Sequence, residues 1–446
     1  MLATVLAVSV GAVAGAGAAE PGRTIPVSVN DAGALGDALS HSQAISADGR
    51  FVAFESQASN LDGLDLNGEF EIFVRDVVGK HTERITTGAL GLGTDLSSGQ
   101  PALSGDGRFV AYMSEATNLV LDDTNEMDDV FVYDRQRKQT ERVSLPTGVS
   151  ARPDPVAALG PGGAARQADG NSEVPSLSAD GRYVAFDSYA DNLVPGDTNG
   201  LSDVFVRDRW TDTTERVDVG PHGEQTTADS GQASISAGGR YIAYESWATE
   251  LVPGDKDDAY DVYVYDRVTH ATERVSVDSR GAGADGASFA PSISADGRYI
   301  AYDSVAGNLV RGDTNGKYDV FVRDRKLATT TRVSVDGAGR QVAGDSGLAS
   351  ISGDGRYVGY HSFASTLVPG DRNGARDVFV FDRTTLAVSR VSVTDDGQDA
   401  AGVSGAPALS ADGRWVAFDS LAPNLAPADT NDADDIFVRD RLGTGP

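Results

Sequence analysis

The chain has 446 residues, of which 40% are hydrophobic, and this is enough for a large buried core. Acidic residues (66) outnumber basic residues (37), so the formal net charge at pH 7 is −29. Such a surface repels phosphate groups, and we expect neither nucleic acid nor an anionic membrane as a partner. The sequence contains no cysteine, which excludes disulfides, thiolate catalysis and cysteine-ligated zinc.

Residues 1–20 have the features of an export segment. Positions 2–13 are apolar, as in the core of a signal peptide, and positions 16–19 supply small residues suited to cleavage. The first basic residue is Arg23, so the basic start of a standard signal peptide is missing. We expect a signal peptide or another N-terminal export segment, and a secreted, periplasmic or cell-surface location; a buried apolar strand or helix is the alternative. No later stretch is long and apolar enough to span a membrane.

One motif then organises the rest of the chain. Ser-x-Asp-Gly-Arg, with Gly in place of Asp in the fourth copy, begins at residues 46, 104, 178, 236, 294, 352 and 410. The spacing is 58 residues throughout, except for 74 residues between the second and third copies. Such regularity indicates a repeat architecture, so residues 21–446 are predicted to form one repeat domain.

Each repeat predicts four β-strands. The dipeptide Asp296-Gly297 is a strong hairpin signal, because Gly tolerates positive φ, and Val, Ile, Tyr and Phe dominate the flanking segments. In the fifth repeat the strands are expected at residues 291–294, 298–304, 319–325 and 330–335. Four-stranded units repeated seven times are typical of propeller blades, so the predicted fold is an all-β, seven-bladed β-propeller.

The two ends of the sequence predict how the ring closes. The seventh repeat runs through the third-strand pattern at 435–441 and lacks a fourth strand. Residues 24–29 (TIPVSV) match the fourth-strand pattern at 272–277 (TERVSV). We therefore expect the N-terminal strand to complete the last blade, which would leave no open edge between the first and last repeats. We also expect the chain to be a monomer.

The longer second spacing places an insertion within residues 146–172. The added residues are rich in Pro, Gly and Ala. Two interpretations stay open: a passive addition to a surface loop, which costs little free energy, or a flap over the centre of the ring.

The loop between the second and third strands carries the pattern Asp-x-Asn/Asp-x-x-x-Asp/Glu in all seven repeats. The candidate metal ligands are Asp65, Asn67, Glu71, Asp123, Asn125, Asp129, Asp197, Asn199, Asp203, Asp255, Asp257, Asp261, Asp313, Asn315, Asp319, Asp371, Asn373, Asp377, Asp429, Asn431 and Asp435. Oxygen ligands at alternate positions suit Ca²⁺, which takes about six to eight oxygens. The loops are similar to the calcium loops of integrin-type propellers, but they are shorter and lack the middle acidic ligand. The alternative is turn formation, since Asp and Asn side chains also cap turns.

The repeat as a whole resembles the TolB-like, WD-type β-propeller repeat. The shared features are the Ser-x-Asp-Gly-Arg turn, an apolar strand, and a second apolar strand that ends in Asp. The resemblance covers essentially the whole chain after residue 23. It implies the propeller fold and no particular activity, because propellers host many functions.

The long second-to-third strand loops and the inter-blade loops are expected on the same face, and binding sites usually lie on long loops held by a rigid scaffold. On that face Trp247 and Phe363 could stack on sugars, although we expect burial between blades instead. The preferred function is an exported, non-enzymatic binding or scaffold propeller, with structural Ca²⁺ as its one candidate cofactor, that recognises a protein, peptide or glycan.

An enzyme is the alternative function: a polysaccharide lyase or hydrolase with its site at the central channel. Such a lyase would need several histidines close together, and the sequence scatters them over distant repeats. At the end of the second strand most repeats have an acidic residue, but the second repeat has Met113 and the sixth has His361 instead. The histidines are His41, His81, His222, His270 and His361. No catalytic residue is predicted from this pattern.

Overall fold

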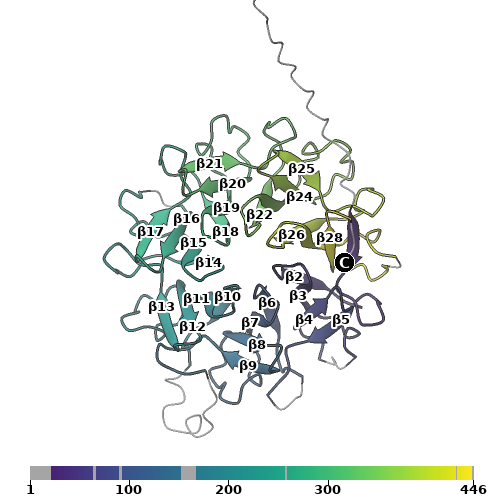
Figure 1. Ribbon diagram of the computed structural model, residues 1–446. Coiled ribbons are helices and arrows are strands. Elements are labelled where there is room, and N and C mark those ends of the chain that lie inside the picture. Colours follow the sequence, from purple (N-terminus) through teal and green to yellow (C-terminus); the bar gives the residue numbers. More distant parts are fainter. Residues whose placement is uncertain are drawn as a thin grey trace, which may run out of the picture.

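The computed structural model describes residues 22–63, 67–89, 93–151, 167–256, 259–427 and 429–443. Within these residues, 28 strands form seven four-stranded antiparallel sheets, which stand as blades around a central axis (Figure 1). No helix occurs in the described ranges. The predicted all-β, seven-bladed propeller is confirmed.

In blades 1–6 the first strand in sequence lies nearest the axis and the fourth lies at the rim, whereas in blade 7 the strand Ser404–Leu409 lies nearest the axis and the N-terminal strand Arg23–Pro26 lies at the rim (Figure 1). Blade 1 contains β2 (Ser40–Ile45), β3 (Phe51–Ser56), β4 (Glu71–Asp76) and β5 (His81–Arg84). Blade 2 contains β6 (Ser98–Leu103), β7 (Phe109–Ser114), β8 (Asp129–Asp134) and β9 (Gln139–Arg142). Blade 3 contains β10 (Ser172–Leu177), β11 (Tyr183–Ser188), β12 (Asp203–Asp208) and β13 (Thr213–Arg216).

The remaining blades repeat this order. Blade 4 contains β14 (Ser230–Ile235), β15 (Tyr241–Ser246), β16 (Asp261–Asp266) and β17 (Ala271–Arg274). Blade 5 contains β18 (Ser288–Ile293), β19 (Tyr299–Ser304), β20 (Asp319–Asp324) and β21 (Thr329–Arg332). Blade 6 contains β22 (Ser346–Ile351), β23 (Tyr357–Ser362), β24 (Asp377–Asp382) and β25 (Ala387–Arg390). Blade 7 contains β26 (Ser404–Leu409), β27 (Trp415–Ser420), β28 (Asp435–Asp440) and β1 (Arg23–Pro26).

Blade 7 joins the two ends of the chain. β1 pairs antiparallel with β28, and the Val27 N–H donates to the Ile436 carbonyl at 2.7 Å. The buried Ser28 hydroxyl donates to Asp435 Oδ1 at 2.6 Å. Figure 1 shows β1 beside β28 at the rim of the ring. The predicted closure by the N-terminal strand is confirmed.

A β-bulge in the innermost strand of every blade shifts the strand boundaries from those expected. β18 begins at Ser288, three residues before the predicted start at 291, and its pairing shifts between Phe289 and Ser292. A bulge breaks the alternation of apolar and polar residues, so the pattern located only the second half of the strand. At the third position of each innermost strand a non-glycine residue has φ between 41° and 54°: Ser42, Gln100, Val174, Gln232, Ala290, Leu348 and Ala406.

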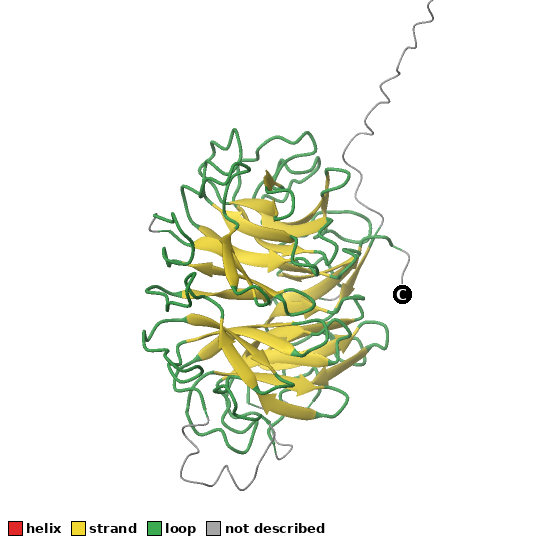
Figure 2. Cartoon of the chain, turned by 60° about the vertical axis from the view of Figure 1, so that its left-hand side comes forward, coloured by secondary structure: helices red, strands yellow, loops and turns green. Residues whose placement is uncertain are grey.

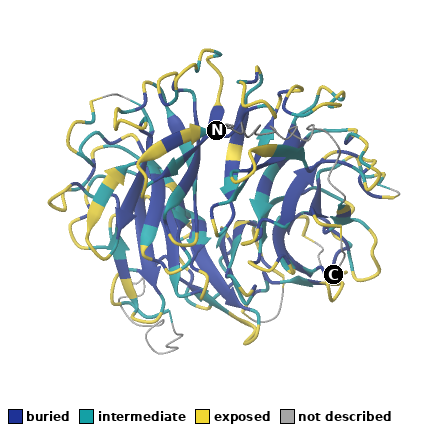
Figure 3. Ribbon diagram, turned by 45° about the horizontal axis from the view of Figure 1, so that its top comes forward, coloured by how far each residue is buried: buried dark blue, intermediate teal, exposed yellow. Residues whose placement is uncertain are grey.

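The core lies between neighbouring blades, and its strands are buried while the loops are exposed (Figure 3). Within a blade the rings of the second and third strands stack, as Phe186 does on Phe205 with centroids 6.0 Å apart. Between blades, the hairpin glycine lies against an aromatic ring. Gly297 has a φ of +73°, and a Cβ there would lie 2.1 Å from the ring of Tyr241. Glycine is therefore required both by the turn and by the packing.

The face that carries the short Asp-Gly hairpins, here called the hairpin face, is tied together by backbone hydrogen bonds. The Ala179 N–H donates to the Ala237 carbonyl at 3.0 Å, and Ala411 to Ala47 at 2.9 Å across the closure of the ring. The opposite face, here called the long-loop face, carries the second-to-third strand loops and the inter-blade loops. Figure 2 shows the strands running between these two loop-bearing faces.

Candidate binding site on the long-loop face

The second strand of most blades carries an acidic residue next to its last position. In four blades the carboxylate of this residue accepts a backbone N–H from the innermost strand of the next blade. The Asp187 carboxylate accepts a 2.8 Å hydrogen bond from the N–H of Gln232, the bulge residue of the next blade. Glu245 accepts one from Ala290 in the same way at 2.7 Å. A carboxylate thus holds the strained left-handed residue of its neighbour in place. The contact recurs between Glu55 and Gln100 and between Asp303 and Leu348.

The departures from this acidic position are accommodated differently. Met113 carries no acceptor there, and the Gln100 side-chain oxygen instead accepts the N–H of Val174 at 2.8 Å. His361 is half-buried, and its partial burial, followed by the nearby charge of Arg376, lowers its pKa to about 4. His361 is therefore neutral at pH 7.

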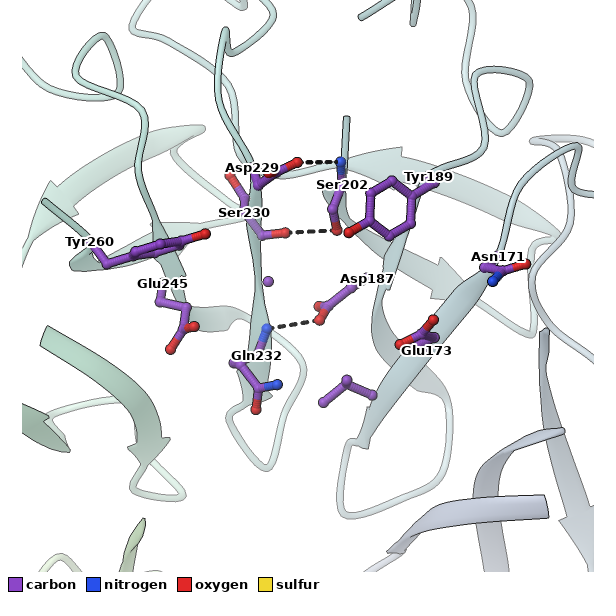
Figure 4. Close-up of a pocket in the computed structure, with 12 residues that line it drawn as sticks. Asn171, Glu173, Asp187, Tyr189, Ser202, Asp229, Ser230, Gln232, Glu245 and Tyr260 are labelled. Atoms are coloured by element: carbon purple, nitrogen blue, oxygen red, sulfur yellow. Dashed lines mark hydrogen bonds between the residues drawn. The ribbon is translucent and has the colours of Figure 1, made fainter. Parts of the chain in front are cut away.

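A cavity of about 230 Å³ lies between blades 3 and 4, where β10 and β14 begin near the axis on the long-loop face (Figure 4). Figure 4 shows Glu173, Asp187 and Glu245 around one space, with the rings of Tyr189 and Tyr260 on its two sides. None of the described residues that line it is basic. The lining residues are Asn171, Glu173, Val174, Asp187, Tyr189, Ser202, Asp229, Ser230, Gly231, Gln232, Glu245 and Tyr260.

The carboxylates of this pocket are poorly solvated. Asp187 is only 9% exposed, and among the described residues no donor forms a hydrogen bond with its Oδ1. Burial, together with the charges of Glu245 and Glu173, raises the pKa of Asp187 well above its usual value. Burial also raises the pKa of Glu245 to about 7. Ionisation of Asp187 and Glu245 in this pocket therefore costs more free energy than ionisation of the same groups in water.

Exposed apolar side chains stand beside this pocket. Trp247 stacks on Tyr260 with centroids 5.7 Å apart, and the Phe289 ring lies tilted against Tyr260 with centroids 5.3 Å apart. Trp247 is 47% exposed and Phe363 is 56% exposed, so the expected burial of these two rings between blades was wrong. The residues that directly follow the second strands of blades 3, 4, 6 and 7 are all exposed and apolar or aromatic: Tyr189, Trp247, Phe363 and Leu421.

On the same face, blades 6, 7 and 1 carry a group of mixed charge. His41 pairs with Glu55, and this hydrogen bond raises the pKa of His41. Burial raises the pKa of both Asp419 and Asp434, although His41 and Arg376 lie close enough to oppose the shift. The face therefore differs in charge on its two sides, with an acidic pocket on blades 3 and 4 and a mixed group here.

The acidic loops predicted to bind Ca²⁺ contact an arginine of the fourth strand in the blades where the whole pair is described. Arg216 Nη1 lies 3.1 Å from Asp197 and 3.0 Å from Asp203. The same arrangement joins Arg142 to Asp123 and Asp129, Arg274 to Asp255 and Asp261, Arg332 to Asp313 and Asp319, and Arg390 to Asp371 and Asp377. In blade 1, Arg84 contacts Glu71 and Asp62. One guanidinium thus already pairs with two carboxylates in each of these loops.

The asparagines of these loops form turns. Asn199 Oδ1 accepts the Leu201 N–H at 3.1 Å, and its amide nitrogen donates to Asp203. Asn67, Asn125, Asn315, Asn373 and Asn431 make the corresponding contacts. Turn formation, one of the two interpretations of the pattern, is therefore present, and Ca²⁺ binding stays a prediction.

Blade 7 is the exception among these loops. Its fourth strand is β1, and Pro26 takes the register position opposite Phe437 that the arginines hold elsewhere. Burial raises the pKa of Asp435 to about 6, and it raises the pKa of Asp429 too. Asp65 and Asp257 lie outside the described residues. In the described part of the chain, no group of three or more acidic or histidine side chains is arranged to hold a metal ion.

Other predicted features lie away from the pocket. His81 pairs with Asp31, and His270 bonds to Tyr265, both in the short turns of the hairpin face. The insertion falls largely on residues 152–166, which lie outside the described residues. Just before it, the Thr147 N–H donates to the Leu193 carbonyl at 2.9 Å. The flap interpretation therefore stays untested.

The pocket itself was missed from the sequence. Asp187 and Glu245 occupy the repeated acidic position of the second strand. Because that position has a structural role in several blades, the sequence did not indicate a binding site there. One signal was present: Glu173 occupies a position that is glycine in four other blades. These glycines are Gly99, Gly231, Gly347 and Gly405.

Comparison with known proteins agrees with the fold. No family model matches the chain, and no curated protein matches it. Oligogalacturonate lyase from Vibrio parahaemolyticus is 12% identical with a TM-score of 0.54, over 96% of this chain and 98% of that one. The propeller domain of the Trilobed protease from Pyrococcus furiosus, described as having an open velcro topology, is 12% identical with a TM-score of 0.52, over 86% and 91%.

TolB from Acinetobacter baumannii is also found, with 15% identity and a TM-score of 0.39 over 72% of this chain. The present chain spans only 58% of that TolB chain. The lyase and the protease propeller domain, with TM-scores above 0.5, share the fold of this chain, and identities of 12% show nothing further. The chain is thus a closed seven-bladed β-propeller, and its function has to be argued from its own residues.

Proposed function

We propose that this chain is an exported binding protein that recognises its partner with the long-loop face, at the pocket between blades 3 and 4. The observation that carries the proposal is the combination of a polar cavity with exposed aromatic rings beside it, on a rigid ring of blades. Exposed aromatic side chains that border a partly desolvated polar pocket are typical of binding surfaces. Export rests on the apolar segment at residues 1–20. In the described part of the chain, no helix combines the length and apolarity needed to cross a bilayer.

A comparison of the two faces tests this proposal. A random displayed-peptide library and a glycan array would be probed with the full chain, and the ligands recovered would then be measured against Trp247→Ala. Trp210→Ala is the matched control, because Trp210 is 65% exposed in a turn of the hairpin face. We expect the Trp247 change to weaken binding by about tenfold or more, and the Trp210 change to leave it unaltered. Equal effects of the two changes would reject the long-loop face as the binding face.

The mixed charge group supports a second candidate function, a polysaccharide lyase or hydrolase. His41 has a raised pKa and lies near Asp419 and Asp434, while Arg376 could hold an acidic sugar. Activity against a panel of acidic and neutral polysaccharides tests this function. Turnover that His41→Gln abolishes would favour the enzyme, and no turnover on any substrate would leave the binding protein as the account.

A further inference from the structure

We propose that the pocket between blades 3 and 4 binds a protonated alkylamine or a guanidinium group, such as the side chain of a lysine or arginine of the partner. This inference rests on the proposed function and specifies the chemistry that the site selects. It is argued from three features of the pocket: its carboxylates, one unpartnered buried oxygen, and the two tyrosine rings.

The carboxylates come from separate strands and converge on the cavity. Glu173 lies on β10, Asp187 on β11 and Glu245 on β15, and Asp229 stands just before β14. No lysine, arginine or histidine is among the described residues that line the cavity. The acidic loops of blades 1–6, in contrast, hold arginines against their carboxylates. The described lining of this pocket lacks the internal counter-charge that those loops contain.

Asp187 is the residue that points to a ligand. Its Oδ2 accepts the Gln232 N–H, while its Oδ1 is buried and has no hydrogen-bond partner among the described residues; Asp303 Oδ1 shares this state, but only Asp187 lines the cavity. A buried carboxylate oxygen without a donor costs free energy, and a donor from a ligand would remove that cost. An alkylammonium or guanidinium group carries several N–H donors and no acceptor, so it fits such a site.

Tyr189 and Tyr260 favour an organic cation over a bare ion. Their rings stand on two sides of the space around the carboxylates (Figure 4). The face of an aromatic ring attracts a cation within about 6 Å, and the ring also covers the methylene groups of a lysine or arginine side chain. The volume of about 230 Å³ accommodates the end of one such side chain.

Binding of a cation should release a proton to the buffer. Burial and the neighbouring charges of Glu245 and Glu173 favour the protonated form of Asp187, and a bound cation favours the ionised form. The other titratable groups around Asp187 are Glu173, Asp229, Glu245, Tyr189 and Tyr260. None of them supplies a positive charge. Burial raises the pKa of Glu245 in the same lining to about 7, so the affinity should rise between pH 6 and pH 8 as this carboxyl group ionises.

Titration of the full chain with small probes tests the inference. The probes are acetyl-Gly-Lys-Gly-amide, acetyl-Gly-Arg-Gly-amide, the norleucine analogue that lacks the charge, and butylamine. Fluorescence of Trp247, which stacks on the lining residue Tyr260, reports binding. We expect the charged peptides to bind at least about tenfold more tightly than the norleucine peptide. Butylamine that binds as tightly as the peptides would indicate a free amine as the ligand, whereas weaker binding would indicate a side chain of a partner.

Matched variants assign the effect to the pocket. Asp187→Asn keeps the acceptor for the Gln232 N–H and removes the charge, and we expect it to weaken the charged probes by about tenfold. Asp303→Asn is the control, because Asp303 caps Leu348 at 2.7 Å in the same way but does not line the pocket. Glu173→Gly is a second test that should fold, since four other blades have glycine at this position.

The outcomes separate the inference from the proposed function. Equal binding of the norleucine and lysine peptides, or equal effects of Asp187→Asn and Asp303→Asn, would overturn the cation site. Failure of every probe would overturn it as well. In either case the library ligands and the Trp247→Ala comparison still decide whether the long-loop face binds a partner.

Discussion

The carboxylate of Asp187 accepts the backbone N–H of Gln232 across the boundary between blades 3 and 4, at 2.8 Å. Gln232 has a φ of 53°, so a charged side chain in one blade holds a left-handed residue in the next. The same contact between Asp303 and Leu348 buries a second carboxylate. These acidic residues position the innermost strands around the axis, and they also place buried carboxyl groups on the long-loop face.

This arrangement predicts how stability depends on pH. Burial raises the pKa of both Glu245 and Asp303 to about 7. A carboxyl group with a raised folded pKa stabilises the fold below its unfolded pKa, and that stabilisation is lost as the pH rises through the folded value. We expect the free energy of unfolding to fall by about 1–3 kcal/mol between pH 4 and pH 8. Below this range the Arg240 hydrogen bond, which lowers the pKa of Asp266, makes acid destabilising.

Urea denaturation at a series of pH values measures this dependence. The double variant Glu245→Gln and Asp303→Asn should show a shallower decline than the wild type from pH 5 to pH 8. Asp432→Asn, at an exposed position, serves as the control and should follow the wild-type curve. A double variant with an unchanged slope would show that these two groups do not titrate as described.

A second prediction concerns the hairpin glycines. Gly297→Ala combines the strain of a positive φ with a Cβ 2.1 Å from the ring of Tyr241, and should cost about 2–4 kcal/mol. Gly312 has a φ of +84° and no atom within 4 Å of its Cβ position, so Gly312→Ala should cost only about 1 kcal/mol. Chemical unfolding of both variants measures the difference. Equal losses would mean that the contact between blades does not constrain the glycine.

The closure of the ring is tested by a pair of serines. Ser28 in the N-terminal segment and Ser334 in blade 5 each donate a buried hydrogen bond to an aspartate, at 2.6 Å and 2.5 Å. Substitution of either by alanine removes the donor to the Oδ1 of that aspartate and should cost about 1–3 kcal/mol. Similar losses in unfolding experiments would show that blade 7 is as firmly held as an internal blade. A much smaller loss for Ser28→Ala would show that the N-terminal strand is weakly attached.

Blade 7 offers the sharpest test of the calcium prediction, because Pro26 stands there in place of the arginine. We expect Ca²⁺ to raise the Tm of the chelator-treated wild type by about 2 °C or more, and to leave Pro26→Arg unaffected. The variant supplies to Asp429 and Asp435 the arginine that the other blades have. No shift in the wild type would reject Ca²⁺ binding, and an equal shift in the variant would place the ion elsewhere.

The sequence predicts most of this fold because the hairpin motif recurs at one period and residues 24–29 match the strand that the last repeat lacks. It does not predict the bulges at Gln100, Gln232, Ala290 and Leu348, because they are stabilised by carboxylates of the preceding blade rather than by local residues. The pocket was not predicted from the sequence for the same reason, because its lining residues come from two different blades. Asp187 resembles Asp303 in sequence, but the residue opposite each on the innermost strand differs, since Glu173 lies opposite Asp187 and Phe289 lies opposite Asp303.

The arginine contacts of the acidic loops also depend on pairing between strands. Asp197 and Asp203 lie 13 or more residues before Arg216 in sequence, and only the pairing of β12 with β13 brings the three together. A pattern of acidic residues in a loop therefore predicts a need for positive charge, but not whether an ion or an arginine meets it.

The central claim is that the pocket between blades 3 and 4 binds a cationic group of a partner, and a crystal structure of the full chain grown with acetyl-Gly-Lys-Gly-amide tests it most directly. The account predicts density for the lysine side chain between Tyr189 and Tyr260, with its ammonium nitrogen about 3 Å from Asp187 Oδ1. A peptide bound on the hairpin face, or an empty pocket at a peptide concentration that saturates the fluorescence change, would contradict it.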